Sequence, residues 1–236
     1  MSDVISIAID GPSGAGKSTL ARKCASSFGF LYVDTGAIYR TVGLAAIRRG
    51  VDRKTESEIS ALLPLLKIEM KYNEDGEQRM FLNGEDVSDS IRMPEVSIAA
   101  SDVSALPAVR GFLMDMQRNL ARSNNVIMDG RDIGTVVLPD ADLKVFLTAS
   151  AEERANRRVL QLKEKGIEED YQKVLDEIRY RDEQDSNREI APLRKSEDAV
   201  LLDTTELSFE ESFSALSQMI LERFFTKPDL NTEEVQ

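Results

Sequence analysis

The sequence predicts an α/β fold in which a parallel β-sheet is flanked by helices. Five short runs of β-branched or other apolar residues are bounded by turn and cap residues, at positions 4–9, 30–33, 126–128, 143–147 and 199–202. Apolar residues fill each run almost without alternation, which is typical of strands that helices cover on both faces. Segments with helical periodicity separate the runs, as expected when crossover helices join parallel strands.

Capping chemistry indicates where two of the helices begin. Ser150 and Ser208 are each followed, three residues later, by a glutamate, Glu153 and Glu211. In this spacing the serine hydroxyl and the glutamate carboxylate can bond the free N–H groups of the first helical turn. We therefore expect helices to begin directly after Ser150 and Ser208.

Two segments depart from this alternation of strands and helices. Between residues 67 and 88, alternating polar and apolar residues lead into a turn at 73–76, and a β-prone run at 80–82 ends at Asn-Gly. This pattern predicts an antiparallel β insertion, with a plain surface loop as the alternative. Residues 166–194 are charge-rich and amphipathic, which indicates a mobile helical lid or a solvated helix pair.

The composition excludes several kinds of chemistry. The 236 residues include no histidine and one cysteine, Cys24, and the net charge is −12. Catalytic sites that need histidine, a disulfide within the chain and a four-cysteine zinc cluster are therefore excluded. The acidic balance argues against nucleic acid and anionic membranes, and no apolar run approaches the ~20 residues that span a bilayer. We expect a cytoplasmic monomer that binds neither.

A phosphate-binding motif follows the first apolar run and matches the pattern G-x-x-x-x-G-K-[ST]. Its glycines allow backbone N–H groups to turn inward around a phosphate, and the helix that follows directs the positive end of its dipole at it. Lys17 would reach the β- and γ-phosphates, and Ser18 would ligate Mg²⁺. The motif and the residue after it are Gly11, Pro12, Ser13, Gly14, Ala15, Gly16, Lys17, Ser18 and Thr19.

Other classes of phosphate-binding loop fit less well. Thr19 stands where a dinucleotide-binding fingerprint needs its third glycine. None of the 13 glycines has an aspartate three positions before it, as the switch of a GTPase would require. Residues 226–229 spell a guanine-recognition tetrapeptide, T-K-P-D, but they do not follow a predicted strand.

Two arginine-bearing segments follow predicted strands, residues 34–40 and residues 129–132. Ligands bind outside the carboxyl ends of parallel strands, so both segments should face the same crevice as the phosphate loop. Arg40 and Arg131 suit bidentate phosphate binding, with a surface ion pair as the alternative for each. Together they favour a second anionic substrate. One helical face would add Arg181, Asp185 and Arg188.

Over nearly its whole length the sequence resembles the bacterial cytidylate kinases, which are nucleoside monophosphate kinases. The resemblance is carried by residues 10–19, 34–40, 129–138 (DGRDIGTVVL) and 181–193, and by the β insertion. It implies transfer of a phosphoryl group from ATP, with Mg²⁺, to CMP or dCMP. It also implies a single kinase domain, 1–236, made of a core at about 1–34, 108–149 and 195–225, an acceptor-binding insertion at about 35–107, a lid at about 150–194 and a polar tail at 226–236.

The resemblance also implies roles for individual residues. Arg40, Arg131 and Arg188 would clamp the acceptor phosphate, and Thr35, which stands where other members carry serine, would contact the acceptor. Cytosine would be read by Ser101, Arg110 and Asp132, and the ribose would be held by Arg181 and Asp185. Arg157 and Arg158 would reach ATP from the lid. The catalytic residues would be Lys17, Arg131, Arg158 and Arg188.

The expected chemistry needs no general base, because the accepting phosphate oxygen is already anionic. Asp129, at a strand end, would hold Mg²⁺ through water or merely cap a turn. Asp132 would accept a hydrogen bond from the cytosine amino group, where uracil carries a carbonyl. The alternatives are a kinase for UMP or shikimate, and a regulator that binds ATP and has no acceptor.

Overall fold

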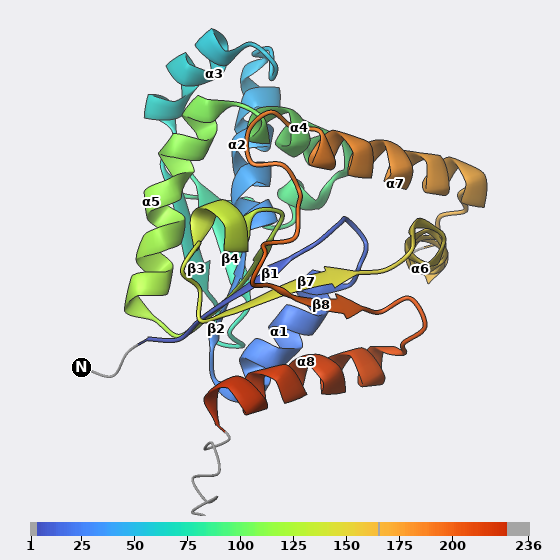
Figure 1. The fold of residues 1–236 in the computed structure, drawn as a ribbon. Coiled ribbons are helices and arrows are strands. Elements are labelled where there is room, and N and C mark those ends of the chain that lie inside the picture. The colour runs from blue at the N-terminus through green and yellow to red at the C-terminus, as the bar shows by residue number, and fades with distance from the viewer. Residues whose placement is uncertain (1–3, 165, 226–236) are drawn as a thin grey trace, which may run out of the picture.

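The computed structural model describes residues 4–164 and 166–225, and its centre is a five-stranded parallel sheet (Figure 1). The strand order is β2-β6-β1-β7-β8. All four pairings in this sheet are parallel, which confirms the α/β prediction. The strands are β1 (Ser6–Asp10), β2 (Leu31–Asp34), β6 (Val126–Gly130), β7 (Leu143–Thr148) and β8 (Val200–Asp203).

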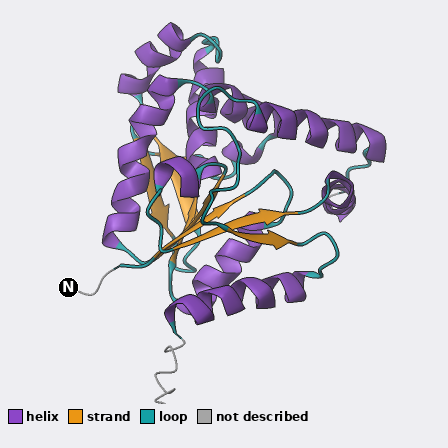
Figure 2. Cartoon of the chain, in the orientation of Figure 1, coloured by secondary structure: helices purple, strands orange, loops and turns teal. Residues whose placement is uncertain are grey.

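Helices cover both faces of this sheet, as Figures 1 and 2 show. In β1, Ile7 and Ile9 pack into one apolar cluster, whereas Ala8 between them packs into another. This burial on both sides explains why the sequences of the inner strands do not alternate. The prediction of a strand buried on both faces is wrong for β8, which lies at the sheet edge with Val200 and Leu201 exposed. On one face lie α1 (Lys17–Phe28) and α8 (Phe209–Phe224), and on the other α2 (Thr35–Arg49) and α5 (Pro107–Ser123).

The segment between α2 and α5 contains the antiparallel sheet that the sequence predicts, so the surface-loop alternative is wrong. Its strand order is β3-β4-β5. The hydroxyl of Tyr72 donates to the carbonyl of Tyr32 at 2.7 Å, which ties this small sheet to β2. The segment consists of α3 (Glu56–Leu62), η1 (Leu63–Leu65), β3 (Ile68–Tyr72), β4 (Gln78–Leu82), β5 (Glu85–Asp86), η2 (Ser90–Arg92) and α4 (Pro94–Ser104).

Two further helices, α6 (Ala151–Glu164) and α7 (Tyr171–Ser186), pack on each other at one end of the sheet (Figure 1). They share an apolar cluster of their own, formed by Ala155, Val174 and Leu175. Both predicted helix starts are confirmed. The capping box is complete at Ser208, whereas the Ser150 backbone N–H donates to the hydroxyl of Thr205 instead of completing a box. A short π-helical segment, η3 (Ile133–Val137), follows β6.

Across the described residues, no single helix is long and apolar enough to cross a membrane. The pair α4 and α5 meets the length and composition required only when the two are taken together, and they are bent by 99° where they meet. The polar tail expected at 226–236, with its T-K-P-D tetrapeptide, lies outside the described residues.

Candidate active site

The phosphate loop connects β1 to α1 with a backbone that only glycine permits at two positions. Gly16 has φ 92° at the start of α1. A Cβ on Gly11 would lie 1.9 Å from the carbonyl oxygen of Leu147 on β7, so the loop could not approach this strand with any other residue there. The predicted motif therefore stands between a buried strand and a helix, as its chemistry requires.

Lys17 is buried inside this loop, where its Nζ donates to the carbonyl of Pro12 at 2.7 Å. Burial, and secondarily repulsion by Arg131, lowers the pKa of the Lys17 ammonium to about 7. Among the residues that the structure describes, no carboxylate lies at hydrogen-bond distance from Lys17 Nζ. A buried ammonium without such a partner is costly, and an anionic phosphate would relieve that cost. The loop is thus electrostatically prepared for an anion.

Ser18, in the first turn of α1, faces Asp129 near the carboxyl end of β6. The Ser18 hydroxyl donates to Asp129 Oδ2 at 2.8 Å, and the Tyr32 hydroxyl donates to Oδ1 at 2.9 Å. Burial raises the pKa of the Asp129 carboxyl. The carboxylate therefore accepts from two hydroxyls rather than capping a turn.

These oxygen donors fit Mg²⁺ of the kind that accompanies a nucleotide. Within the described residues, no group of three carboxylate or thiol side chains could hold a metal ion alone. Mg²⁺ commonly binds through one or two protein oxygens, with phosphate oxygens and waters completing its shell. Ser18 and Asp129 supply that partial set.

A cluster of arginines surrounds Asp185, which is almost fully buried. Arg131 Nε donates to Asp185 at 2.8 Å, and Arg188 pairs with the same carboxylate. Burial, together with the neighbouring positive charges of Arg131, Arg40 and Arg188, lowers the pKa of Arg181 to about 10. Positive charge therefore exceeds the negative charge of Asp185 at this place, as a site for a dianionic phosphate requires.

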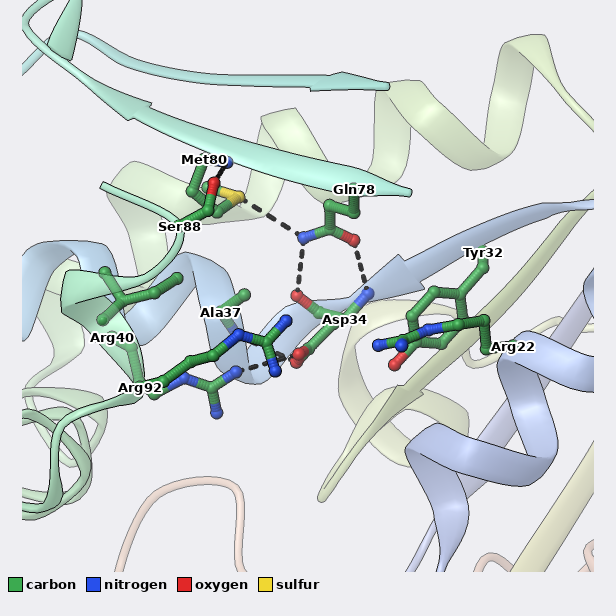
Figure 3. Close-up of a pocket in the computed structure, with 10 residues that line it drawn as sticks. Arg22, Tyr32, Asp34, Ala37, Arg40, Gln78, Met80, Ser88 and Arg92 are labelled. Carbon is green, nitrogen blue, oxygen red and sulfur yellow. Dashed lines mark hydrogen bonds and ion pairs between the residues drawn. The ribbon is translucent and has the colours of Figure 1, made fainter. Parts of the chain in front are cut away.

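Arg40 lies at the edge of this cluster, beside a pocket that Figure 3 shows. Asp34 holds Arg40 through an ion pair of 2.8 Å. Arg22 and Arg92 also line the pocket. Sequence reasoning missed Arg92 because its segment precedes α4 and follows none of the parallel strands.

Arg110 and Asp132 form a buried ion pair, with side chains 5% and 6% exposed. Arg110 Nη1 also donates to the Ser104 carbonyl at 3.2 Å, and its guanidinium lies over the Tyr39 ring. Burial raises the pKa of the Asp132 carboxyl, although Arg110, Arg188 and Arg131 oppose that shift. The positive charges of Arg131 and Arg188, which belong to the cluster around Asp185, therefore also act on Asp132.

The comparisons with known proteins agree with this geometry. Residues 7–222 match the family model described as cytidylate kinase. The chain belongs to the cytidylate kinase family. A cytidylate kinase from Caldicellulosiruptor bescii is 52% identical over 221 residues, 94% of this chain and 96% of that protein. One from Geobacter sulfurreducens is 48% identical over 217 residues, 92% of this chain and 93% of that protein.

A solved structure with a similar outline is the shikimate kinase from Bacteroides thetaiotaomicron. It has a TM-score of 0.44 and 15% sequence identity, and the match covers 92% of this chain and 97% of that one. A likeness at this level gives no support to shikimate as the acceptor.

Thr35 and Ser101 differ in how they contact the other predicted site residues of this cytidylate kinase family member. The Thr35 hydroxyl donates to the Asp129 carbonyl at 2.8 Å, so it is already engaged. Ser101 is half-buried on α4, and its carbonyl accepts from Ser104. No hydrogen bond joins Ser101 to Arg110 or Asp132 in the described part of the chain.

The two predicted lid arginines lie apart from the phosphate loop. Arg157 donates to Glu153 at 2.8 Å and to the carbonyl of Thr204, after β8, at 2.6 Å. Arg158 is exposed and makes no hydrogen bond or ion pair with the described residues. The arginine of α6 that does contact the loop is Arg154, which donates to the Ser13 carbonyl at 3.0 Å.

Sequence reasoning missed Arg154 and also Asp10. Asp10 accepts the backbone N–H groups of Ile133 and Gly134, each at 2.7 Å, and thereby fixes the turn after Asp132. Burial raises the pKa of Asp10 to about 6. An acidic residue ending an otherwise apolar strand, directly before the phosphate loop, was the available signal for Asp10.

Proposed function

We propose that the chain transfers the γ-phosphoryl group of ATP to CMP and dCMP, which yields CDP or dCDP and ADP. Family membership at about half identity supports this reaction. The observation that carries the acceptor assignment is the buried Arg110–Asp132 pair beside the arginine cluster around Asp185. A cytosine amino group would donate to Asp132, and Arg110 would donate to the acceptor atoms of the base.

The proposed mechanism uses positioning and charge neutralisation. Lys17 would bind the β- and γ-phosphates, and Arg131 and Arg188 would hold the acceptor phosphate and the charge that develops in transfer. Arg158, exposed on α6, is available to reach the phosphates as a further catalytic group. Arg157 would reach ATP only by leaving Glu153 or Thr204.

The other predicted residues would bind the acceptor or Mg²⁺. Arg40 would join the clamp on the acceptor phosphate, and Arg181 and Asp185 would hold the ribose. Thr35 and Ser101 would line the acceptor site, Thr35 after releasing the Asp129 carbonyl. Ser18, and Asp129 through water, would hold Mg²⁺, which supplies neutralisation of the triphosphate charge.

We also propose a division of the chain into a core, an insertion and a lid. The core would comprise about 1–34, 108–149 and 195–225, with an acceptor-binding insertion at about 35–107 and a lid at about 150–194. We infer a cytoplasmic monomer, and the net charge of −12 argues against nucleic acid and anionic membranes as its partners.

An acceptor screen tests the proposed function. Release of ADP from Mg-ATP would be measured with CMP, dCMP, UMP, AMP, GMP or shikimate, and without acceptor. We expect rapid release with CMP and dCMP only. Best turnover with another acceptor would contradict the base assignment, and equal release without any acceptor would indicate a regulator that hydrolyses ATP.

A further inference from the structure

Arg154 joins three separate parts of the molecule through one buried guanidinium. Its Nε donates to the Ala149 carbonyl at 2.9 Å, before α6, and its Nη1 donates to the Ser13 carbonyl at 3.0 Å, in the phosphate loop. The same guanidinium donates hydrogen bonds to both carboxylate oxygens of Asp182 on α7, at 3.0 and 2.6 Å. A Cβ on Gly14 would lie 3.5 Å from Arg154 Cβ, so the loop backbone also packs on the arginine stem.

Asp182 is followed on α7 by Asp185, three residues later, which belongs to the acceptor site. Asp185 accepts from Arg131 at 2.8 Å, and Arg181 and Arg188 flank it in sequence. Side chains three residues apart on a helix occupy neighbouring positions on its surface. The helix α7 is therefore linked to both sites. Its Asp182 binds Arg154 of α6, which contacts the phosphate loop, and its Asp185 binds Arg131 in the acceptor cluster.

We propose that the Arg154–Asp182 pair couples the binding of ATP to the binding of CMP, with both residues acting as positioning residues. The inference rests on the proposed function. ATP phosphates would fix the phosphate loop, and with it the Ser13 carbonyl, Arg154 and α7. The acceptor residues of α7 are then already ordered when CMP arrives, so less conformational entropy is lost on the second binding step. Coupling of this kind is reciprocal between the two ligands.

The same two helices are joined by a second ion pair, which provides a matched control. Arg179 of α7 bonds Glu152 of α6 at 2.6 Å, but both side chains are more than half exposed. Exposed pairs contribute little, whereas the Arg154 side chain is only 5% exposed. Since the cluster of Ala155, Val174 and Leu175 also holds α6 on α7, loss of either pair should leave the helices packed.

The test is calorimetric measurement of the Kd for CMP without and with a saturating, non-hydrolysable ATP analogue and Mg²⁺. In the wild-type protein we expect the analogue to lower the Kd for CMP by about fivefold or more, within the usual range of coupling energies. In Asp182→Asn the ratio of the two Kd values should fall toward one, while the Kd for CMP alone stays within about threefold. Asp182→Glu should restore part of the ratio. The control Glu152→Gln should retain the wild-type ratio.

Arg154→Lys provides a second variant, because a lysine cannot bond the Ser13 carbonyl and both Asp182 oxygens at once. An unchanged ratio in Asp182→Asn or Arg154→Lys would overturn the inference, as would an equal loss in Glu152→Gln. A wild-type ratio of one, with both nucleotides binding, would contradict the coupling alone. Failure of the wild-type protein to bind CMP under either condition would contradict the proposed function instead.

Discussion

The side-chain amide of Gln78 pairs with the backbone of Asp34 as a neighbouring strand would (Figure 3). Gln78 Oε1 accepts from the Asp34 N–H at 2.8 Å, and Nε2 donates to the Asp34 carbonyl at 3.2 Å. Asp34 in turn caps α2 through the N–H of Ala37 and holds Arg40 at 2.8 Å. The inserted sheet thus fixes the place of an arginine that we assign to the acceptor phosphate.

Replacing Gln78 should therefore weaken the binding of the acceptor, CMP, and leave the binding of the donor, ATP, unchanged. Gln78→Leu removes two hydrogen bonds from the half-buried backbone of Asp34, each worth about 0.5–1.5 kcal/mol, and loosens the residue that holds Arg40. We expect the KM for CMP to rise about tenfold, with the KM for ATP within about twofold. Glu77→Gln, the exposed neighbour just before β4, should change neither. Equal rises in both KM values for Gln78→Leu would contradict this role.

Lys17→Ala should remove phosphoryl transfer and leave a folded protein. The charge of Lys17 gains importance as negative charge develops on the transferred group. We expect kcat to fall by at least about a hundredfold, the scale found when one stabilising group is removed from a transition state. Circular dichroism would check the fold. A kcat near the wild-type value would show that Lys17 is not catalytic.

Lys17 should also lower the free energy of unfolding of the ligand-free protein. Because burial lowers the pKa of Lys17 to about 7, the unfolded state binds more protons than the native state between pH 7 and the ordinary lysine pKa. Lys17→Met should thus be more stable than wild type by at least about 1 kcal/mol at pH 7 or below. That advantage should shrink as the pH rises toward 10. Urea unfolding at several pH values measures it, and a constant difference would contradict the lowered pKa.

The helices α6 and α7 should close when both nucleotides bind. Arg131, Arg181 and Arg188 repel one another around Asp185, and a bound phosphate would convert this repulsion into charge-assisted hydrogen bonds. Closure would also exclude water from ATP. We expect hydrogen exchange at 150–190 to slow markedly with CMP plus a non-hydrolysable ATP analogue, and less with either alone. Equal protection without ligand and with both would mean that these helices are a fixed part of the scaffold.

The sequence alone predicted the features that depend on local pattern. Strands buried on both faces have nearly continuous apolar runs, so β1, β2, β6 and β7 could be located, and the phosphate loop matches its motif at every position. The apolar run of β8 also located a strand, but Val200 and Leu201 are exposed there, at the edge of the sheet. The family resemblance grouped Arg110 with Asp132 as readers of cytosine, whereas the ion pair between them was found only in the structure.

What the sequence did not predict are contacts between segments far apart in the chain. Arg154 resembles its neighbours Arg157 and Arg158 in the sequence, and only the packing of α6 on α7 and the phosphate loop distinguishes them. Gln78 is likewise an ordinary polar residue of a strand until the inserted sheet brings it to Asp34.

In the proposed reaction Asp132 reads the amino group of cytosine, and the ratio of kcat/KM for CMP to that for UMP tests this role most directly. The buried Asp132 carboxylate would meet the uracil carbonyl as one acceptor facing another. We therefore expect the wild-type protein to favour CMP by at least about a hundredfold, and Asp132→Asn to lower that ratio about tenfold or more, since an amide can donate to the carbonyl. A wild-type ratio near one, or a ratio unchanged in Asp132→Asn, would contradict the assignment.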